Sequence, residues 1–168
     1  MKKYIDCDGV ILDTENGLFD DYEEMVREHP DLTIREYLQN IDWESWIAQA
    51  AVLKDSINIL KNYDPVDTEI LTRVSSMHEA IAKINYFRSK GVRNNIIIVP
   101  DIKKKSQVVT AFNNILVDDS ESNLREWENN FGIPYCFGSE SSEFERIDSL
   151  DDVLNPKKLA KRLETNKR

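Results

Sequence analysis

The sequence predicts an α/β protein with a doubly wound parallel sheet and a small all-helical insertion. From about residue 65 onward, short apolar segments alternate with segments of helical periodicity. The apolar segments contain few polar residues, which is typical of strands buried on both faces. Between residues 14 and 64, apolar residues recur at helical spacing without strand-like alternation. We therefore expect a core formed by residues 1–13 and 65–168, with residues 14–64 inserted as a helical unit.

The chain enters the core through one short strand. Residues 3–7 form an apolar run that stops at the turn-forming pair Asp8-Gly9. The insertion then carries its apolar residues in three clusters at helical spacing, which predicts three or four helices.

The remaining elements alternate regularly. Gly91 closes one predicted helix, Pro100 stops a strand, and Pro156 interrupts the last helix. The expected strands are 68–72, 95–99, 114–118 and 133–137, and the expected helices are 77–90, 104–112, 120–130 and 150–163.

Charge and composition limit the classes of molecule that the protein is expected to bind. With 22 basic and 31 acidic residues, the net charge of −9 disfavours a nucleic-acid polymer. A metal ion at an acidic site would reverse the sign locally, so small phosphorylated substrates remain compatible. We find no signal peptide and no apolar run long enough for a membrane span, and two cysteines make no disulfide framework. We therefore expect a cytoplasmic protein without a membrane partner.

Acidic side chains follow two of the predicted strands. Asp6 and Asp8 end the first, and Asp118 and Asp119 end the strand at 114–118. Carboxyl ends of adjacent parallel strands meet at one edge of a sheet, where ligands bind. Four carboxylates crowded there repel one another unless a divalent cation lies among them, and oxygen ligands without His or Cys favour Mg²⁺.

Other interpretations of these residues are weaker. Capping of the following helix explains one of Asp118 and Asp119, but not both. A calcium-binding EF-hand loop starting at Asp6 would need Asp or Asn at the position of Val10. A cysteine phosphatase using Cys7 would need an arginine where Asp13 stands.

Four segments together resemble the motifs of the haloacid dehalogenase superfamily. They are Asp6-Cys7-Asp8-Gly9-Val10, Ile70-Leu71-Thr72, a lysine of the run 103–105, and Ile115-Leu116-Val117-Asp118-Asp119. Their order and spacing fit from about residue 2 to residue 140. The helical insertion is similar to the superfamily's type-one cap. The resemblance implies a Rossmann-like core and phosphohydrolase chemistry.

The resemblance also implies a role for each residue. Asp6 would attack phosphorus and form an aspartyl-phosphate, and Asp8 would act as general acid and then base. Thr72 would bind a phosphate oxygen, and a lysine would balance its charge. Lys105 has the best spacing to Asp118, with Lys104 second and Lys103 also possible. The metal ligands would be Asp6, the Asp8 carbonyl, Asp118 and, less directly, Asp119.

The sequence predicts the substrate less clearly than the chemistry. The short cap and the Asp118-Asp119 pair look like the cytosolic 5'(3')-deoxyribonucleotidase branch, which suggests a nucleoside 5'-monophosphate as one small phosphorylated substrate. The sequence Thr72-Arg73-Val74 lacks the proline that often follows the threonine in that branch. Arg73 is a candidate for contacting phosphate or ribose. Phe19, Trp43 and Trp46 are candidates for stacking on a base, although aromatic residues at helical spacing are more often core.

Two other functions remain open. One is phosphotransfer, or a phosphatase acting on a protein or polynucleotide end. The other is a non-catalytic binding module with the same fold. The basic segment 157–168 is either a docking tail or a solvated last helix.

Overall fold

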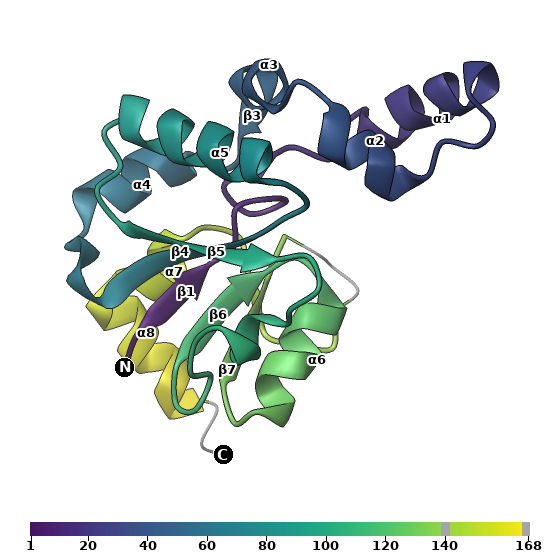
Figure 1. Ribbon diagram of the computed structural model, residues 1–168. Coiled ribbons are helices and arrows are strands. Elements are labelled where there is room, and N and C mark those ends of the chain that lie inside the picture. Colours follow the sequence, from purple (N-terminus) through teal and green to yellow (C-terminus); the bar gives the residue numbers. More distant parts are fainter. Residues whose placement is uncertain (139–141, 166–168) are drawn as a thin grey trace.

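The computed structural model describes residues 1–138 and 142–165. At its centre lies a parallel six-stranded sheet in the order β5-β4-β1-β6-β7-β8 (Figure 1). The strands are β1 (Lys3–Ile5), β4 (Thr68–Val74), β5 (Asn95–Pro100), β6 (Ile115–Asp118), β7 (Ile133–Phe137) and β8 (Arg146–Ile147). Helices cover both faces of this sheet, so the predicted fold class, a doubly wound Rossmann-like α/β core, is confirmed.

Alternation along each strand sends side chains to two separate cores. Ile5, Ile70 and Val117 face one side, where they pack with two helices of the insertion, with the helix that follows β4, and with the helices at the end of the chain. These helices are α3 (Trp43–Gln49), α4 (Ser56–Asn62), α5 (Met77–Ser89), α7 (Asp151–Leu154) and α8 (Pro156–Thr165).

The second core lies on the opposite face. Tyr4, Leu71 and Leu116, each adjacent in sequence to a residue of the first core, pack there against α6 (Glu121–Asn129). The ring of Tyr4 meets that of Trp127 edge to face, with 5.5 Å between centroids. Because both faces are buried, the strands have no polar face, as the apolar runs in the sequence predict.

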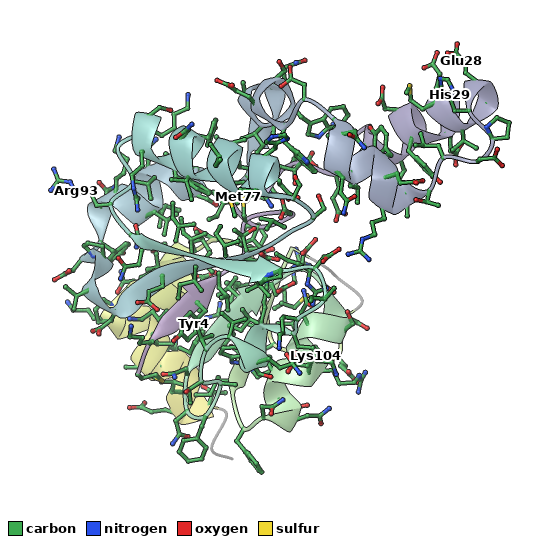
Figure 2. The ribbon with its side chains drawn as sticks, in the orientation of Figure 1. Tyr4, Glu28, His29, Met77, Arg93 and Lys104 are labelled. Atoms are coloured by element: carbon green, nitrogen blue, oxygen red, sulfur yellow. The ribbon has the colours of Figure 1, made fainter. Side chains whose placement is uncertain are left out.

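The segment between β1 and β4 contains four helices. α1 (Leu18–Glu28) and α2 (Ile34–Asn40) project away from the sheet, and Glu28 and His29 mark their far tip (Figures 1 and 2). α3 and α4, in contrast, bury Ile47 and Leu60 in the first core. The separation of residues 14–64 as a unit of its own stays a prediction.

Three expectations about local structure were wrong in part, and one element was missed. The insertion is not purely helical, since β2 (Leu12–Asp13) pairs antiparallel with β3 (Ala51–Val52) at its base. The helix expected at 104–112 is only a 3₁₀ turn at Lys105–Gln107, because residues 110–114 turn into β6. β4 continues past Thr72 to Val74. The short edge strand β8 was not foreseen, since two residues give no periodicity.

The end of the chain packs against the core as a helix. Within the described residues of the basic segment, Lys158 pairs with Asp151 and Asp152, and Arg162 pairs with Glu145. The final residues, 166–168, lie outside the described part of the chain. None of the helices in the described residues combines the length and apolar character that a membrane span requires.

Candidate active site at the carboxyl edge of the sheet

Asp6 and Asp118 lie side by side because their strands are neighbours. In the parallel pairing of β1 and β6, Ile5 lies opposite Val117, so the next residues of the two strands, Asp6 and Asp118, meet at the carboxyl edge. The backbone N–H of Asp6 continues the ladder by donating to the Val117 carbonyl at 2.9 Å. Strand order and register, which residue spacing alone does not give, thus bring together two carboxylates more than a hundred positions apart.

A buried lysine joins these two carboxylates. The Nζ atom of Lys105 lies 2.8 Å from Asp6 Oδ2 and 2.5 Å from Asp118 Oδ2. Its side chain is only 1% exposed, so both ion pairs lie out of water, where an unpaired charge would be costly. Of the three adjacent lysines, the structure places Lys105 in the site, whereas Lys103 and Lys104 are exposed.

Further hydrogen bonds fix the orientation of Asp118. Its Oδ1 accepts from the Ser120 backbone N–H at 2.9 Å, and both oxygens lie within 3.2 Å of the Asn123 side-chain amide. Asp6 in turn accepts the Cys7 N–H at 2.8 Å through Oδ1. Asn123, from the first half of α6, has no distinctive sequence signal, and sequence analysis missed it.

Asp119 completes an acidic cluster. Carboxylate oxygens of Asp6, Asp118 and Asp119 all lie within 4.8 Å of one another. Burial, followed by the charges of Asp118 and Glu15, raises the pKa of Asp119 to about 7. Burial also raises the pKa of Asp6 to about 8, because the charges of Asp118 and Asp8 oppose the attraction of Lys105.

This donor set fits a hard divalent cation. Three clustered carboxylates offer the oxygen ligands that Mg²⁺ prefers, and the raised pKa values of Asp6 and Asp119 indicate that the protein compensates these two charges only in part. Among the described residues no histidine or cysteine joins this cluster, so the softer ligands typical of zinc sites are missing.

Metal binding should depend on pH through these two carboxyl groups. With pKa values of about 8 and about 7, Asp6 and Asp119 hold protons in the metal-free protein that Mg²⁺ must displace. We expect Mg²⁺ affinity to rise between about pH 6 and about pH 9, with proton release strongest at the acid end. Titration calorimetry in buffers of different ionisation enthalpy measures both quantities.

The raised pKa values of Asp6 and Asp119 also predict how the stability of the metal-free protein changes with pH. Above their ordinary pKa values, these carboxyls bind protons in the folded chain but not in the unfolded one. Their contribution to the free energy of unfolding therefore falls as the pH rises toward the raised values. Stabilisation by Mg²⁺ should accordingly be larger at the alkaline end. An affinity that does not change with pH would contradict the assignment of Asp6 and Asp119 as ligands.

Gly9 leaves the space that Asp119 occupies. Its φ of +69° is in the left-handed region, and an added Cβ would lie 2.0 Å from Asp119 Oδ2. We expect Gly9→Ala to displace the Asp119 carboxylate and to add backbone strain of about 1–2 kcal/mol. Mg²⁺ affinity should fall, as measured by calorimetry. Gly17→Ala is the matched control, because Gly17 also has a positive φ but nothing lies within 4 Å of its Cβ position. Equal metal affinity in the two variants would refute the steric argument.

Asp8 lies outside this cluster and has different partners. Its Oδ1 accepts from the Thr14 hydroxyl at 2.6 Å, and its Oδ2 lies 2.6 Å from Lys83 Nζ. Burial alone would raise the pKa of Asp8, but the charge of Lys83 and hydrogen bonds from Lys83 and Thr14 outweigh it and lower the pKa. Sequence analysis missed Lys83, since a lysine within a helix is normally exposed.

Thr72 lies beside Asp8 but is not among the residues that line the pocket described below. Its side chain is fully buried, and its hydroxyl is 3.0 Å from Lys83 Nζ and 3.4 Å from Asp8 Oδ2. The residues of this strand end that line the pocket are Arg73, Val74 and Ser75. The structure therefore brings Thr72 to the site but engages its hydroxyl with Asp8 and Lys83.

A pocket of about 340 Å³ opens over the strand ends. Asp6, Asp8 and Asp119 line it from the sheet, and Trp43 and Leu38 line it from the insertion. Of the three aromatic candidates, only Trp43 borders this pocket. Phe19 is exposed, and Trp46 borders a separate groove while donating from Nε1 to the Thr14 carbonyl.

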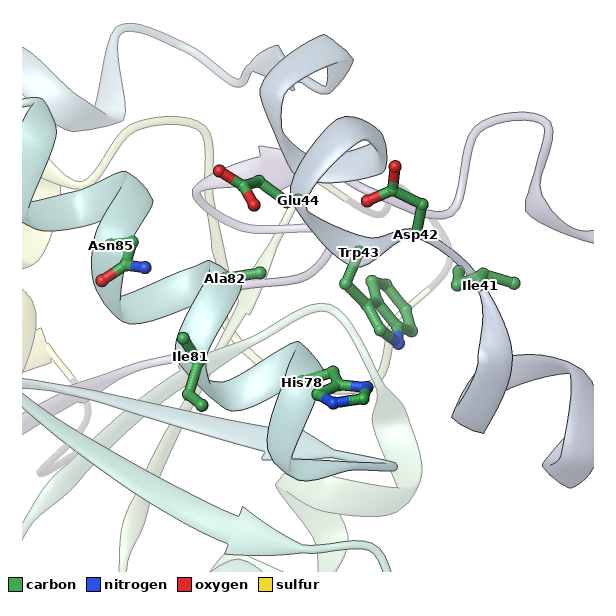
Figure 3. Close-up of a pocket in the computed structure, with 8 residues that line it drawn as sticks. All are labelled: Ile41, Asp42, Trp43, Glu44, His78, Ile81, Ala82 and Asn85. Carbon is green, nitrogen blue, oxygen red and sulfur yellow. The ribbon is translucent and has the colours of Figure 1, made fainter.

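A second hollow lies between α3 and α5 (Figure 3). The indole of Trp43 enters it from α3, and His78 lies opposite on α5. It measures about 240 Å³ and contains none of the strand-end carboxylates. The candidate active site is therefore the larger of these two pockets, and Trp43 lines both.

Comparisons with known proteins identify the fold. No family model matches the chain, and no curated protein matches it. A HAD-superfamily hydrolase of subfamily IA from Geobacter sulfurreducens matches with a TM-score of 0.63 and 11% identity, covering 92% of this chain and 98% of that one. A haloacid dehalogenase-like protein of unknown function from Agrobacterium tumefaciens matches with a TM-score of 0.61 and 12% identity, covering 96% of this chain and 98% of that one. A β-phosphoglucomutase from Clostridium difficile matches with a TM-score of 0.57 and 13% identity, covering 99% of each chain. The structural neighbours thus include HAD-superfamily hydrolases, and the chain shares their fold.

Proposed function

We propose that this chain is a Mg²⁺-dependent phosphomonoester hydrolase that acts on a small phosphorylated metabolite through an aspartyl-phosphate. The observation that carries the proposal is the pairing of Asp6 and Asp8 at one pocket, each held by its own buried lysine. Two carboxylates with different partners suit two different tasks, nucleophilic attack and proton transfer. Fold similarity to solved HAD-superfamily hydrolases agrees with this chemistry.

Asp6, Asp118 and Asp119 would hold the cation, together with the backbone carbonyl of Asp8. When bound, the cation offsets the negative charge of nucleophile and phosphate, which otherwise repel each other. Lys105 adds a positive charge directly beside the nucleophilic carboxylate, at 2.8 Å from Asp6 Oδ2.

In the first step, an Asp6 oxygen bonds to phosphorus while the bond to the leaving oxygen breaks. Asp8 gives that oxygen a proton. In the second step, Asp8 takes a proton from a water molecule whose oxygen bonds to phosphorus. The bond between phosphorus and Asp6 then breaks, and inorganic phosphate leaves. The ionised state that Lys83 favours in Asp8 suits this second step directly. The first step needs a protonated Asp8, and the negative charge of an incoming phosphate raises its pKa in that direction.

The pocket favours a small leaving group. Its volume of about 340 Å³ lies near the lower end of typical small-molecule sites. Trp43 offers an aromatic surface and Arg73 a cation at its edge, so a nucleoside 5'-monophosphate is one candidate, as in the deoxyribonucleotidase-like branch. Residues 14–64 would act as the cap that selects it. A reducing compartment such as the cytoplasm suits the two buried free thiols, Cys7 and Cys136.

The test is phosphate release from a broad panel of phosphorylated metabolites, with Mg²⁺ and with EDTA. Magnesium-dependent release supports the proposal, and the ranking of nucleotides against sugar phosphates identifies the leaving group. Transfer of phosphate to a second substrate instead of water would favour a phosphotransferase. If folded, metal-binding protein released no phosphate from any substrate, the remaining interpretation would be a non-catalytic binding module with this fold.

A further inference from the structure

Lys83 is a fully buried lysine whose part in the chemistry above is limited to the charge of Asp8. It projects from α5, and its side chain is 0% exposed. Its Nζ lies within 3.1 Å of four acceptors: Asp8 Oδ2 at 2.6 Å, Glu79 Oε1 at 2.7 Å, the Thr72 hydroxyl at 3.0 Å and the Arg73 carbonyl at 3.1 Å. A buried lysine needs such partners, but only one of them, Asp8, belongs to the reacting groups.

The two buried lysines of the site divide the acidic side chains between them. Lys105 pairs with Asp6 and Asp118, which belong to the metal cluster. Lys83 pairs with Asp8 and Glu79, which do not. Asp8 is only two residues from Asp6, so its carboxylate would otherwise be a ready fourth ligand for a cation in the cluster.

Asp8 is also fixed through its other oxygen. Thr14 donates to Oδ1 from the start of the insertion, while Lys83 holds Oδ2 from α5. With one oxygen held on each side, the carboxylate has one orientation, at the wall of the pocket. A base that must take a proton from water loses its use when it coordinates the cation or turns away.

We propose that Lys83 is a positioning residue that keeps the Asp8 carboxylate out of the metal cluster and directed at the water that releases phosphate from Asp6. The inference rests on the proposed function and concerns its second step. In that step the water oxygen bonds to phosphorus, its proton passes to Asp8, and the bond to Asp6 breaks. Lys83 touches neither substrate nor metal and acts through Asp8 alone.

The test compares wild type with Lys83→Met, which keeps the length of the side chain and removes its charge. We expect kcat for an aryl phosphate to fall about 10–100-fold, as is typical when the partner of a reacting group is lost. KM should change little, because phosphate still meets Asp6 and Lys105. Protein-bound phosphate, trapped by acid quench, should accumulate, since the second step is the one that slows.

Metal affinity gives a readout independent of turnover. Removing a positive charge and freeing Asp8 should make Mg²⁺ bind Lys83→Met as tightly as wild type or more tightly. Damage to the fold would instead weaken metal binding, raise KM and lower kcat together. Lys90→Met, an exposed lysine on the same side of the sheet at the end of α5, is the matched control and should behave as wild type.

A second variant guards against misfolding. Lys83→Met alone leaves Glu79 buried without its cation, whereas Lys83→Met with Glu79→Gln removes both charges. The same fall in kcat with bound phosphate in this double variant supports the proposal. Active wild type with folded Lys83 variants of unchanged kcat would overturn the proposal and leave the function standing. Wild type without any phosphatase activity would overturn both.

Discussion

Replacing Asp6 with asparagine should abolish phosphate release. Asparagine has nearly the shape of aspartate, and its oxygen can still accept the Cys7 N–H, but its neutral amide is a poor nucleophile. We expect kcat to fall by about 10⁴- to 10⁶-fold, the range seen when an enzyme loses its attacking group. Phosphate release with Mg²⁺ measures the loss, and the variant should form no acid-stable protein-bound phosphate.

The Asp6 variant should remain folded. Burial raises the pKa of Asp6 and disfavours its charged form in the metal-free site, and Lys105 keeps Asp118 as its partner, so we expect the variant to fold. Asp20→Asn provides a matched control, because Asp20 lies exposed on the projecting α1. Turnover by Asp6→Asn close to that of this control would exclude an aspartyl-phosphate at Asp6.

Removing Lys105 should lower the stability of the metal-free protein strongly. Its ammonium is the shared partner of Asp6 and Asp118, and its side chain is almost wholly buried. Lys105→Met would leave the buried Asp118 without its cation and would remove the contact with Asp6. We expect the free energy of unfolding of the metal-free protein to fall by about 3–5 kcal/mol, as when one partner of a buried ion pair is lost. Denaturant unfolding measures it.

Magnesium should restore part of that stability, because a divalent cation supplies the charge that the two carboxylates have lost. The control is Lys104→Met, the exposed neighbour, whose backbone N–H still bonds to Gln107. Its stability should change by no more than about 0.5 kcal/mol. If both variants were equally stable, the ion pairs of Lys105 would contribute less to the free energy of unfolding than their burial predicts.

The strand ends could be predicted from local sequence. An apolar run such as residues 115–117 followed by two aspartates predicts a buried strand that stops at carboxylates, and parallel sheets expose such ends at one edge. Asp6, Asp8, Asp118 and Asp119 were found in this way. The proximity of Asp6 to Asp118 follows from β1 lying beside β6, a strand order that local sequence leaves open and that the structure shows.

Lys105 could be chosen among three lysines only by spacing, and the structure supplies the reason for the choice. The 3₁₀ turn at Lys105–Gln107 points one lysine inward, while the two before it stay exposed. The longer helix predicted there was wrong because apolar spacing over residues 104–112 does not reveal that the chain turns at Asn113, where φ is positive.

The sequence by itself predicted the fold class, which the structure confirms, and the carboxylates on which the proposed chemistry rests, since both follow from short segments: buried strands, and aspartates directly after them. Only the tertiary structure decided which partner each carboxylate has. Lys83 on α5 reaches Asp8, and Thr72 turns its hydroxyl to the same pair, while Phe19 and Trp46 lie away from the pocket that Trp43 borders. These contacts join residues far apart in sequence, and they depend on how α5 and the insertion pack over the sheet, which no local pattern of residues specifies.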